Sequence, residues 1–134
     1  MASILRVDTL TDASSNNSIT MAIIANGVPK VTLHLNSMTS TPTQSEVLNV
    51  SSVDDDGTGD FGIHFSSNFN TANYIMTHAV NDGGASTAQF ATDITYGTNT
   101  TATTDIENHY VDASNNRTNA DSYGIMLAFF GDIA

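Results

Sequence analysis

Apolar residues stand at every second position in two stretches of this chain, and this alternation constrains the fold more than any other feature. Residues 31–35 read Val-Thr-Leu-His-Leu, and residues 61–65 read Phe-Gly-Ile-His-Phe. A period of two is that of a β-strand with one buried face. Segments rich in Gly, Pro, Asn, Asp and Ser, which favour turns, separate such stretches. The chain is therefore expected to fold mainly from strands.

The remaining segments extend this pattern into an all-β domain. Residues 46–53 and 61–65 predict the clearest hairpin, joined by the turn Asp-Asp-Asp-Gly-Thr-Gly-Asp at 54–60. No stretch of useful length has the period of a helix. About seven or eight short strands predict a single small antiparallel β-sandwich of the jelly-roll type. Further strand-like runs lie at 19–25, 74–80, 88–96, 106–111 and 123–130.

The segment from Tyr123 to Phe130 is apolar on both faces, unlike the alternating strands. A strand of this kind lies either in the centre of the core or at a subunit interface. The residues predicted to form core or oligomer interface are therefore Tyr123, Ile125, Met126, Leu127, Phe129 and Phe130.

A chain of 134 residues suffices for one domain with one core. We divide it into an extended N-terminal docking arm at 1–18 and a β-sandwich domain at 19–134. An extended, half-apolar segment can add to the exposed sheet edge of a neighbouring molecule. The side chains expected to dock in this way are Ile4, Leu5, Val7 and Leu10.

The charge of the chain argues against two classes of partner. The net charge is -11, and the fixed cations are Arg6, Lys30 and Arg117. Nucleic-acid binding needs a basic patch, and an anionic membrane surface repels an acidic protein. Cysteine is absent, which excludes disulfides and thiolate chemistry. With no signal-peptide pattern and no membrane-length apolar run, we expect synthesis in the cytoplasm.

Two patterns invite a metal-binding interpretation. The acidic turn 54–60 offers carboxylates that suit calcium, but Phe65 stands where an EF-hand loop needs a bidentate glutamate. We favour a simple hairpin turn. His78 shares a predicted strand face with Met76 and Val80, so it is expected to be partly buried. No spacing typical of zinc ligands connects the histidines, so we expect scattered surface or interface positions for His34, His64, His78 and His109.

The sequence predicts no enzyme, no cofactor and no metal. It contains no Gly-x-Ser-x-Gly elbow, and no apolar pocket is evident beside Asp105 and Glu107. A carbohydrate-binding module is one alternative, because exposed aromatic rings can stack on sugars. We favour ordinary strand packing for the tyrosines concerned, which are Tyr96, Tyr110 and Tyr123.

Several segments resemble small structural proteins of tailed bacteriophages, in the same order and with similar spacing. Ser-Ile-Leu-Arg-Val-Asp-Thr-Leu-Thr-Asp at 3–12 is similar to the family's Ser-x-Leu-Lys-Val-Asp-x-Ile/Leu-Thr-Asp, with Arg6 at the usual lysine. Residues 49–65 match an Asn-Val-Ser-Ser-Val run followed by an acidic Gly-Thr-Gly-Asp turn and an aromatic residue. Shorter matches are Gly27-Val-Pro-Lys30, Asn73-Tyr74 and Ala128-Phe-Phe-Gly-Asp132.

The family is the tail-fibre-like group found in phages of aquatic bacteria, including cyanobacterial phages. The resemblance implies a virion structural protein that forms a symmetric homo-oligomer, with a trimer expected. It implies other tail or capsid proteins as partners and contact with a glycan on the host surface. A capsid decoration protein is the alternative within the same class. The resemblance transfers no catalytic residue.

Overall fold

The structure is a computed structural model that describes residues 7–11, 18–36, 42–81, 89–94, 99–112 and 114–134. The described chain begins with strands β1 (Thr9–Thr11) and β2 (Ser18–Thr20) and helix α1 (Met21–Gly27). Strands of the sandwich follow in the order β3 (Val31–Asn36), β4 (Thr43–Leu48), β5 (Val50–Gly57), β6 (Asp60–Phe65), β7 (Ile75–Asn81), β8 (Gln89–Ile94), β9 (Thr103–Val111), β10 (Arg117–Asn119) and β11 (Gly124–Phe130).

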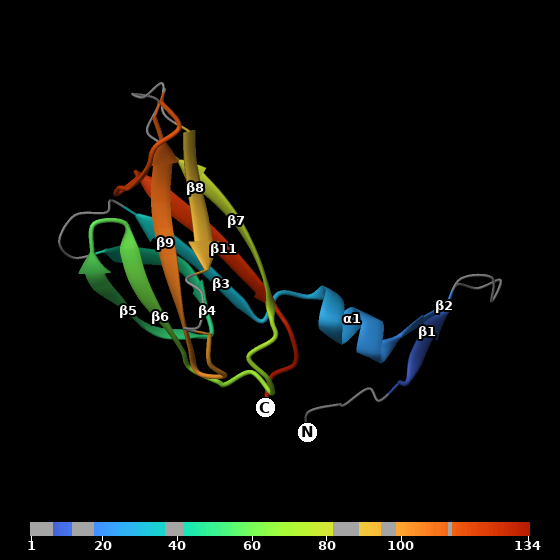
Figure 1. Ribbon diagram of the computed structural model, residues 1–134. Coiled ribbons are helices and arrows are strands. Elements are labelled where there is room, and N and C mark those ends of the chain that lie inside the picture. Colours follow the sequence, from blue (N-terminus) through green and yellow to red (C-terminus); the bar gives the residue numbers. More distant parts are fainter. Residues whose placement is uncertain (1–6, 12–17, 37–41, 82–88, 95–98, 113) are drawn as a thin grey trace.

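Two antiparallel sheets pack face to face, which confirms the prediction of a small all-β sandwich (Figure 1). The first sheet has the order β4-β3-β11-β7. The second sheet has the order β10-β9-β6-β5, and β8 also pairs with β9. The chain moves repeatedly between the sheets, and β11 pairs antiparallel with β3, the first strand of the sandwich.

The core lies between the sheets and follows the period of two seen in the sequence. Along β3 the side chains alternate between buried and half-buried, and Phe61, Ile63 and Phe65 of β6 all point inward. Four aromatic rings close one end of the core. Phe65 lies edge-on to Phe69 and Phe129, at centroid distances of 5.1 and 5.6 Å. Tyr74 completes this cluster.

The long strand expected at 46–53 is two strands that belong to different sheets. The chain changes sheet at Asn49, whose φ of 57° ends the extended backbone. Asparagine tolerates this left-handed conformation better than most residues. Its amide accepts a hydrogen bond from the Ser67 backbone N–H at 2.7 Å and donates one to the Ser67 carbonyl at 3.1 Å. These bonds anchor the corner between β4 and β5.

The expected strand at 19–25 is wrong, because most of this run is helix α1. Thr20 has an extended backbone, and its hydroxyl accepts a hydrogen bond from the Ile23 backbone N–H, as an N-cap does. Methionine and alanine in the run favour a helix. The helix ends at Gly27, two residues before Pro29.

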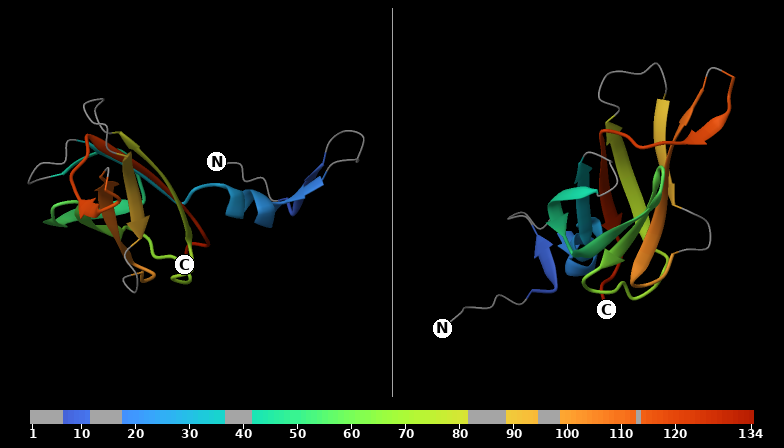
Figure 2. Two further views of the ribbon diagram at one scale, coloured as in Figure 1. Left: turned by 45° about the horizontal axis from the view of Figure 1, so that its top comes forward. Right: turned by 90° about the vertical axis from the view of Figure 1, so that its left-hand side faces the viewer.

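The strands β1 and β2 and the helix α1 form a projection that leaves the sandwich. Figure 1 and the left view of Figure 2 show this N-terminal projection extending away from both sheets. It joins the sandwich at β3, and the Lys30 ammonium group donates a hydrogen bond to the carbonyl of Ala25 near this junction. The sandwich itself begins with β3 at Val31.

Candidate interaction surfaces

The central strand β11 divides its apolar side chains between two environments. Ile125, Leu127 and Phe129 are buried between the sheets. Met126 and Phe130 alternate with them and lie on the outside of the first sheet. Tyr123 precedes the strand and is 65% exposed, so it does not belong to the core. The sequence could not separate these roles because both faces of the segment are equally apolar.

The outside of the first sheet, here called the outer face, combines exposed apolar side chains with uncharged polar ones. Met126 is 40% exposed, and the side chains that flank it on the neighbouring strands are His34 and Ala79. Cross-strand pairing sets Phe130 beside Ile75, which is 70% exposed. The residues of the outer face that contribute apolar surface are Val47, Leu48, Ile75, Ala79, Met126, Ala128 and Phe130.

One corner of the outer face is polar and ordered by hydrogen bonds. The Asn36 side-chain amide donates to the Ser45 hydroxyl at 2.8 Å, and the same hydroxyl lies 3.4 Å from Nδ1 of His34. The imidazole lies over Gly124, because a Cβ added there would be only 3.1 Å from His34 Nε2. These contacts fix the position of the His34 ring beside Met126.

Met126 forms a ridge between two open hollows on the outer face. The first hollow has a volume of about 420 Å³, and its lining includes Thr32, His34, Val47 and Met126. The second has a volume of about 260 Å³, and its lining includes Thr77, Ala79 and Ala128. The outer face is thus contoured rather than flat.

Carboxylates are distributed very unequally between the sheets. Among the four strands of the first sheet, Glu46 is the one carboxylate, and no lysine or arginine occurs there. Strands β5, β6 and β9 of the second sheet hold six carboxylates, namely Asp54, Asp55, Asp56, Asp60, Asp105 and Glu107. The two sides of the sandwich therefore differ strongly in charge.

Gly62 forms the floor of the acidic cluster on the second sheet. A Cβ added at Gly62 would lie 3.1 Å from the Asp56 carboxylate and 3.6 Å from that of Asp105. Burial raises the pKa of the Asp60 carboxyl, and the charges of Asp56, Glu107 and Asp105 raise it further. The absence of a side chain at Gly62 thus lets several carboxylates crowd together.

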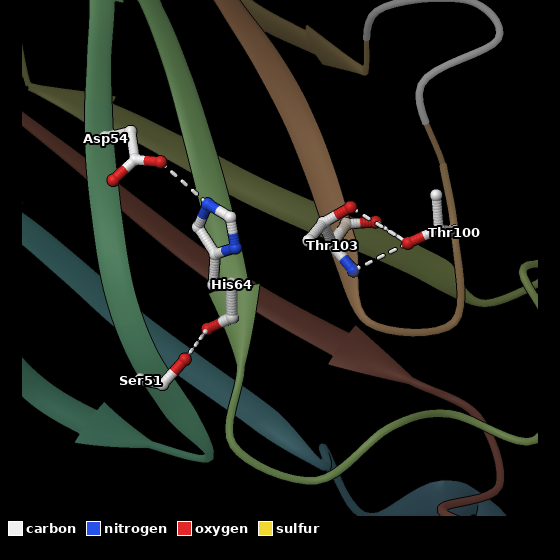
Figure 3. A network of polar contacts seen from close by, with 5 residues as sticks. All are labelled: Ser51, Asp54, His64, Thr100 and Thr103. Carbon is white, nitrogen blue, oxygen red and sulfur yellow. Dashed lines mark hydrogen bonds and ion pairs between the residues drawn. The ribbon is translucent and has the colours of Figure 1, made fainter.

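Two of these carboxylates contact a basic side chain. Figure 3 shows His64 of β6 pointing toward Asp54 of β5, with Nε2 2.7 Å from the carboxylate oxygen. The Arg117 guanidinium donates to Glu107 at 2.6 Å. Where a turn leads into β9, the Thr100 and Thr103 hydroxyls lie 2.8 Å apart, and Figure 3 shows the two side chains facing each other.

The acidic cluster does not form a metal site in the described part of the chain. No group of three or more His, Asp or Glu side chains there is arranged to hold a metal ion. The turn expected at 54–60 is shorter than predicted: residues 54–57 continue strand β5, and Thr58 and Gly59 close the β5–β6 hairpin. Gly57 and Gly59 have positive φ angles.

Replacement of Asp60 with asparagine is expected to raise the stability of the protein, and the size of this gain should depend on pH. Because the folded-state pKa lies above the ordinary value of 3.8, stability falls as pH rises from there through the folded-state pKa. Asp60→Asn removes a charge that opposes folding, so its melting temperature should exceed that of the wild type at pH 7. The gain in melting temperature should vanish below pH 3.8, where the Asp60 carboxyl of the wild type is protonated in the folded and the unfolded protein.

Thermal unfolding followed by circular dichroism at several pH values measures this gain. Asp8→Asn is the matched control, since Asp8 is exposed and lies in the N-terminal projection. If Asp8→Asn raised the melting temperature as much as Asp60→Asn, the cause would be the lower net charge and not the crowding of carboxylates around Asp60.

The histidines remain apart, as the sequence suggested. His34 lies on the outer face, and His64 lies beside the carboxylates of the second sheet. His109 is buried, which corrects the expected surface or interface position, because β9 is an inner strand of the second sheet. His78 is exposed, which corrects the expectation of partial burial. It shares the inward side with Met76 and Val80, but β7 is an edge strand of the first sheet and leaves it open to solvent.

The N-terminal projection exposes apolar side chains. Leu10 and Val7, both expected to dock, are exposed, whereas Ile4 and Leu5 lie outside the described residues. Ile23 of α1 and Val28 are 59% and 49% exposed and were not anticipated. The sequence signal for the helix was the N-cap threonine followed by a run containing methionine and alanine.

A third hollow lies where the projection meets the sandwich. Its volume is about 280 Å³, and it is lined by Asn26, Asn70, Asn73, Asp132, Ile75 and Phe130 among others. Of the tyrosines considered for sugar stacking, Tyr96 lies outside the described residues, Tyr110 is half-buried and Tyr123 is exposed. The amides of Asn26, Asn70 and Asn73 offer a hydroxyl-rich ligand a second group of polar contacts in this hollow.

Comparison with known proteins found no matching protein family, no matching curated protein and no matching solved structure. In the described part of the chain, no helix is long and apolar enough to cross a membrane.

Proposed function

We propose that this protein is a non-enzymatic structural component of a bacteriophage particle. It is a tail-fibre or appendage subunit that assembles as a symmetric homo-oligomer, a trimer, and meets the host surface. The observation that carries the proposal is the N-terminal projection, which exposes Val7, Leu10, Ile23 and Val28 away from its own sandwich.

The projection suits a docking role for a physical reason. Full burial of an apolar side chain of this size is favourable by about 1.5–3 kcal/mol, so a partner that covers the projection gains this free energy for each of them. An extended segment with such side chains can bind along a sheet edge of another protein. Because the projection lies apart from the sandwich, it can dock without disturbing the core.

Removal of residues 2–12 tests this role. We expect the truncated protein to keep the sandwich but to be missing from purified phage particles, because the apolar contacts of the projection are lost. The measurement is quantitative mass spectrometry of particles from infected cells that express the variant. Incorporation at the wild-type level would contradict the docking role.

Matched point variants sharpen this test. Leu10→Asp places a charge on a side chain that we expect to be buried in the particle, whereas Asp8→Asn changes an exposed neighbour. Incorporation should fall for Leu10→Asp and stay unchanged for Asp8→Asn. An antibody label on intact particles would then place the protein on the tail or on the capsid, and a capsid position would favour decoration over attachment.

Carbohydrate binding is the second candidate, and the hollow beside α1 favours it. Asn70 and Asn73 line this hollow, and amide groups hydrogen-bond well to sugar hydroxyls, while Ile75 and Phe130 supply an apolar wall. Asn70→Ala with Asn73→Ala should abolish binding to a host-polysaccharide or glycan array. Asn115→Ala, in an exposed loop, is the control. Absence of glycan binding by the wild type would remove this candidate.

A further inference from the structure

We propose that the outer face of the first sheet is the surface through which copies of this chain associate with one another. This inference deepens the oligomeric part of the proposed function and assigns it to named residues. The occupant of the face is a second copy of the same chain. Three observations support it: the distribution of carboxylates between the sheets, the contour of the outer face, and the placement of its exposed apolar side chains.

The charge distribution selects this face for self-association. Two molecules that each carry a net charge of -11 repel one another, so they meet most easily where carboxylates are fewest. The first sheet carries only Glu46, whereas β5, β6 and β9 carry six carboxylates. When the outer faces meet, the acidic clusters of both copies stay directed toward solvent.

The shape of the face is complementary to itself. Met126 stands as a ridge, with hollows of about 420 and 260 Å³ on its two sides. A copy of the same surface offers both a ridge and hollows that can receive it, so copies can pack around a three-fold axis, as in the proposed trimer, or meet across a two-fold axis. Methionine is unbranched and adapts to irregular gaps, so it suits the position of a ridge.

The exposed apolar side chains of the outer face are spread across the first sheet from one edge strand to the other. Leu48 lies on β4, Met126 and Phe130 on β11, and Ile75 on β7, and three of them are between 40% and 70% exposed. Exposed apolar groups that run together across a sheet mark an interaction surface rather than a random distribution. A partner on this face would therefore cover them together.

The experiment compares the mass of purified proteins by light scattering at several concentrations. The wild type should have a mass that is a multiple of the 14.1 kDa chain. Met126→Asp should yield monomers, because the new carboxylate would stand in the contact and meet the Glu46 carboxylate that lines one hollow of the facing copy. Association should weaken by about 30-fold or more. Met126→Leu, which keeps the apolar ridge, should retain the wild-type mass.

Two further variants exclude trivial explanations. Ser52→Asp adds the same charge to an exposed position of the second sheet and should leave the mass unchanged. Thr77→Glu alters an exposed outer-face position on edge strand β7, so it should dissociate the oligomer even if Met126→Asp fails to fold. Circular dichroism confirms the fold of each variant.

Clear outcomes would overturn the inference. A monomeric wild type at every concentration, or oligomers of Thr77→Glu and folded Met126→Asp equal to the wild type, would show that copies do not meet at the outer face. Equal dissociation by Ser52→Asp would attribute the effect to charge alone. Since these masses are measured without phage, they are distinguishable from a failure of particle incorporation, which concerns the proposed function itself.

Discussion

Replacement of Phe129 with alanine is expected to lower the free energy of unfolding by about 3–5 kcal/mol. Phe129 is completely buried on the central strand β11. Its ring contacts Phe65 at a centroid distance of 5.6 Å and Tyr74 at 5.7 Å. Truncation therefore removes apolar burial and two edge-to-face contacts, and it leaves a cavity between residues that come from several strands.

Urea unfolding followed by fluorescence or circular dichroism measures this loss. Tyr123→Ala is the matched control, because Tyr123 is an aromatic residue beside the same strand but is 65% exposed. Its loss should stay within about 0.5 kcal/mol, as for most surface substitutions. Similar losses in the two variants would contradict the placement of Phe129 in the core.

Gly59→Ala is expected to lower the free energy of unfolding by about 2–4 kcal/mol. The backbone at Gly59 has a φ of +70°, which disfavours any side chain. A Cβ there would lie 2.3 Å from the carbonyl oxygen of Asn108 and 2.7 Å from the backbone nitrogen of Ala120. Both atoms belong to the backbone, so neither can rotate away.

The clash would disturb a set of hydrogen bonds that joins three segments. The Asn108 backbone N–H donates to the Gly59 carbonyl at 2.6 Å, and its side-chain amide donates to the Ala120 carbonyl at 2.7 Å. The Gly59 N–H donates to the Asp121 carboxylate at 2.8 Å. Movement at Gly59 would therefore loosen the β5–β6 turn, β9 and the segment that follows β10.

Thermal and urea unfolding measure the effect of Gly59→Ala. Gly27→Ala is the control, because no atom lies within 4 Å of the Cβ position at Gly27 and its φ is ordinary. That control should be neutral or slightly stabilising, since alanine restricts the unfolded chain more than glycine does. Wild-type stability of Gly59→Ala would show that the turn can move away from β9 at little cost.

The sequence by itself determined the all-β class and the strands with a clear alternation. Residues 31–35 and 61–65 carry a signal that depends only on local spacing, because inward and outward side chains must alternate along a half-buried strand. The β5–β6 hairpin was also readable, because Asp and Gly favour turns, but its turn is only Thr58 and Gly59, since Asp54, Asp55 and Asp56 pair within the sheet or continue β5. The excess of carboxylates was also evident, but not their concentration on one sheet.

The tertiary structure alone decided the features that depend on neighbouring strands. Asn49 could not be recognised as the corner between sheets, since its role depends on hydrogen bonds to Ser67. The apolar run after Thr20 has the composition of either a strand or a helix, and its N-cap contact settles it as α1. Met126 became a surface ridge and Phe129 a core residue because pairing with β3 and β7 fixed which side of β11 faces the second sheet. An apolar pattern records which side chains avoid water, but packing determines whether the core or a partner covers them.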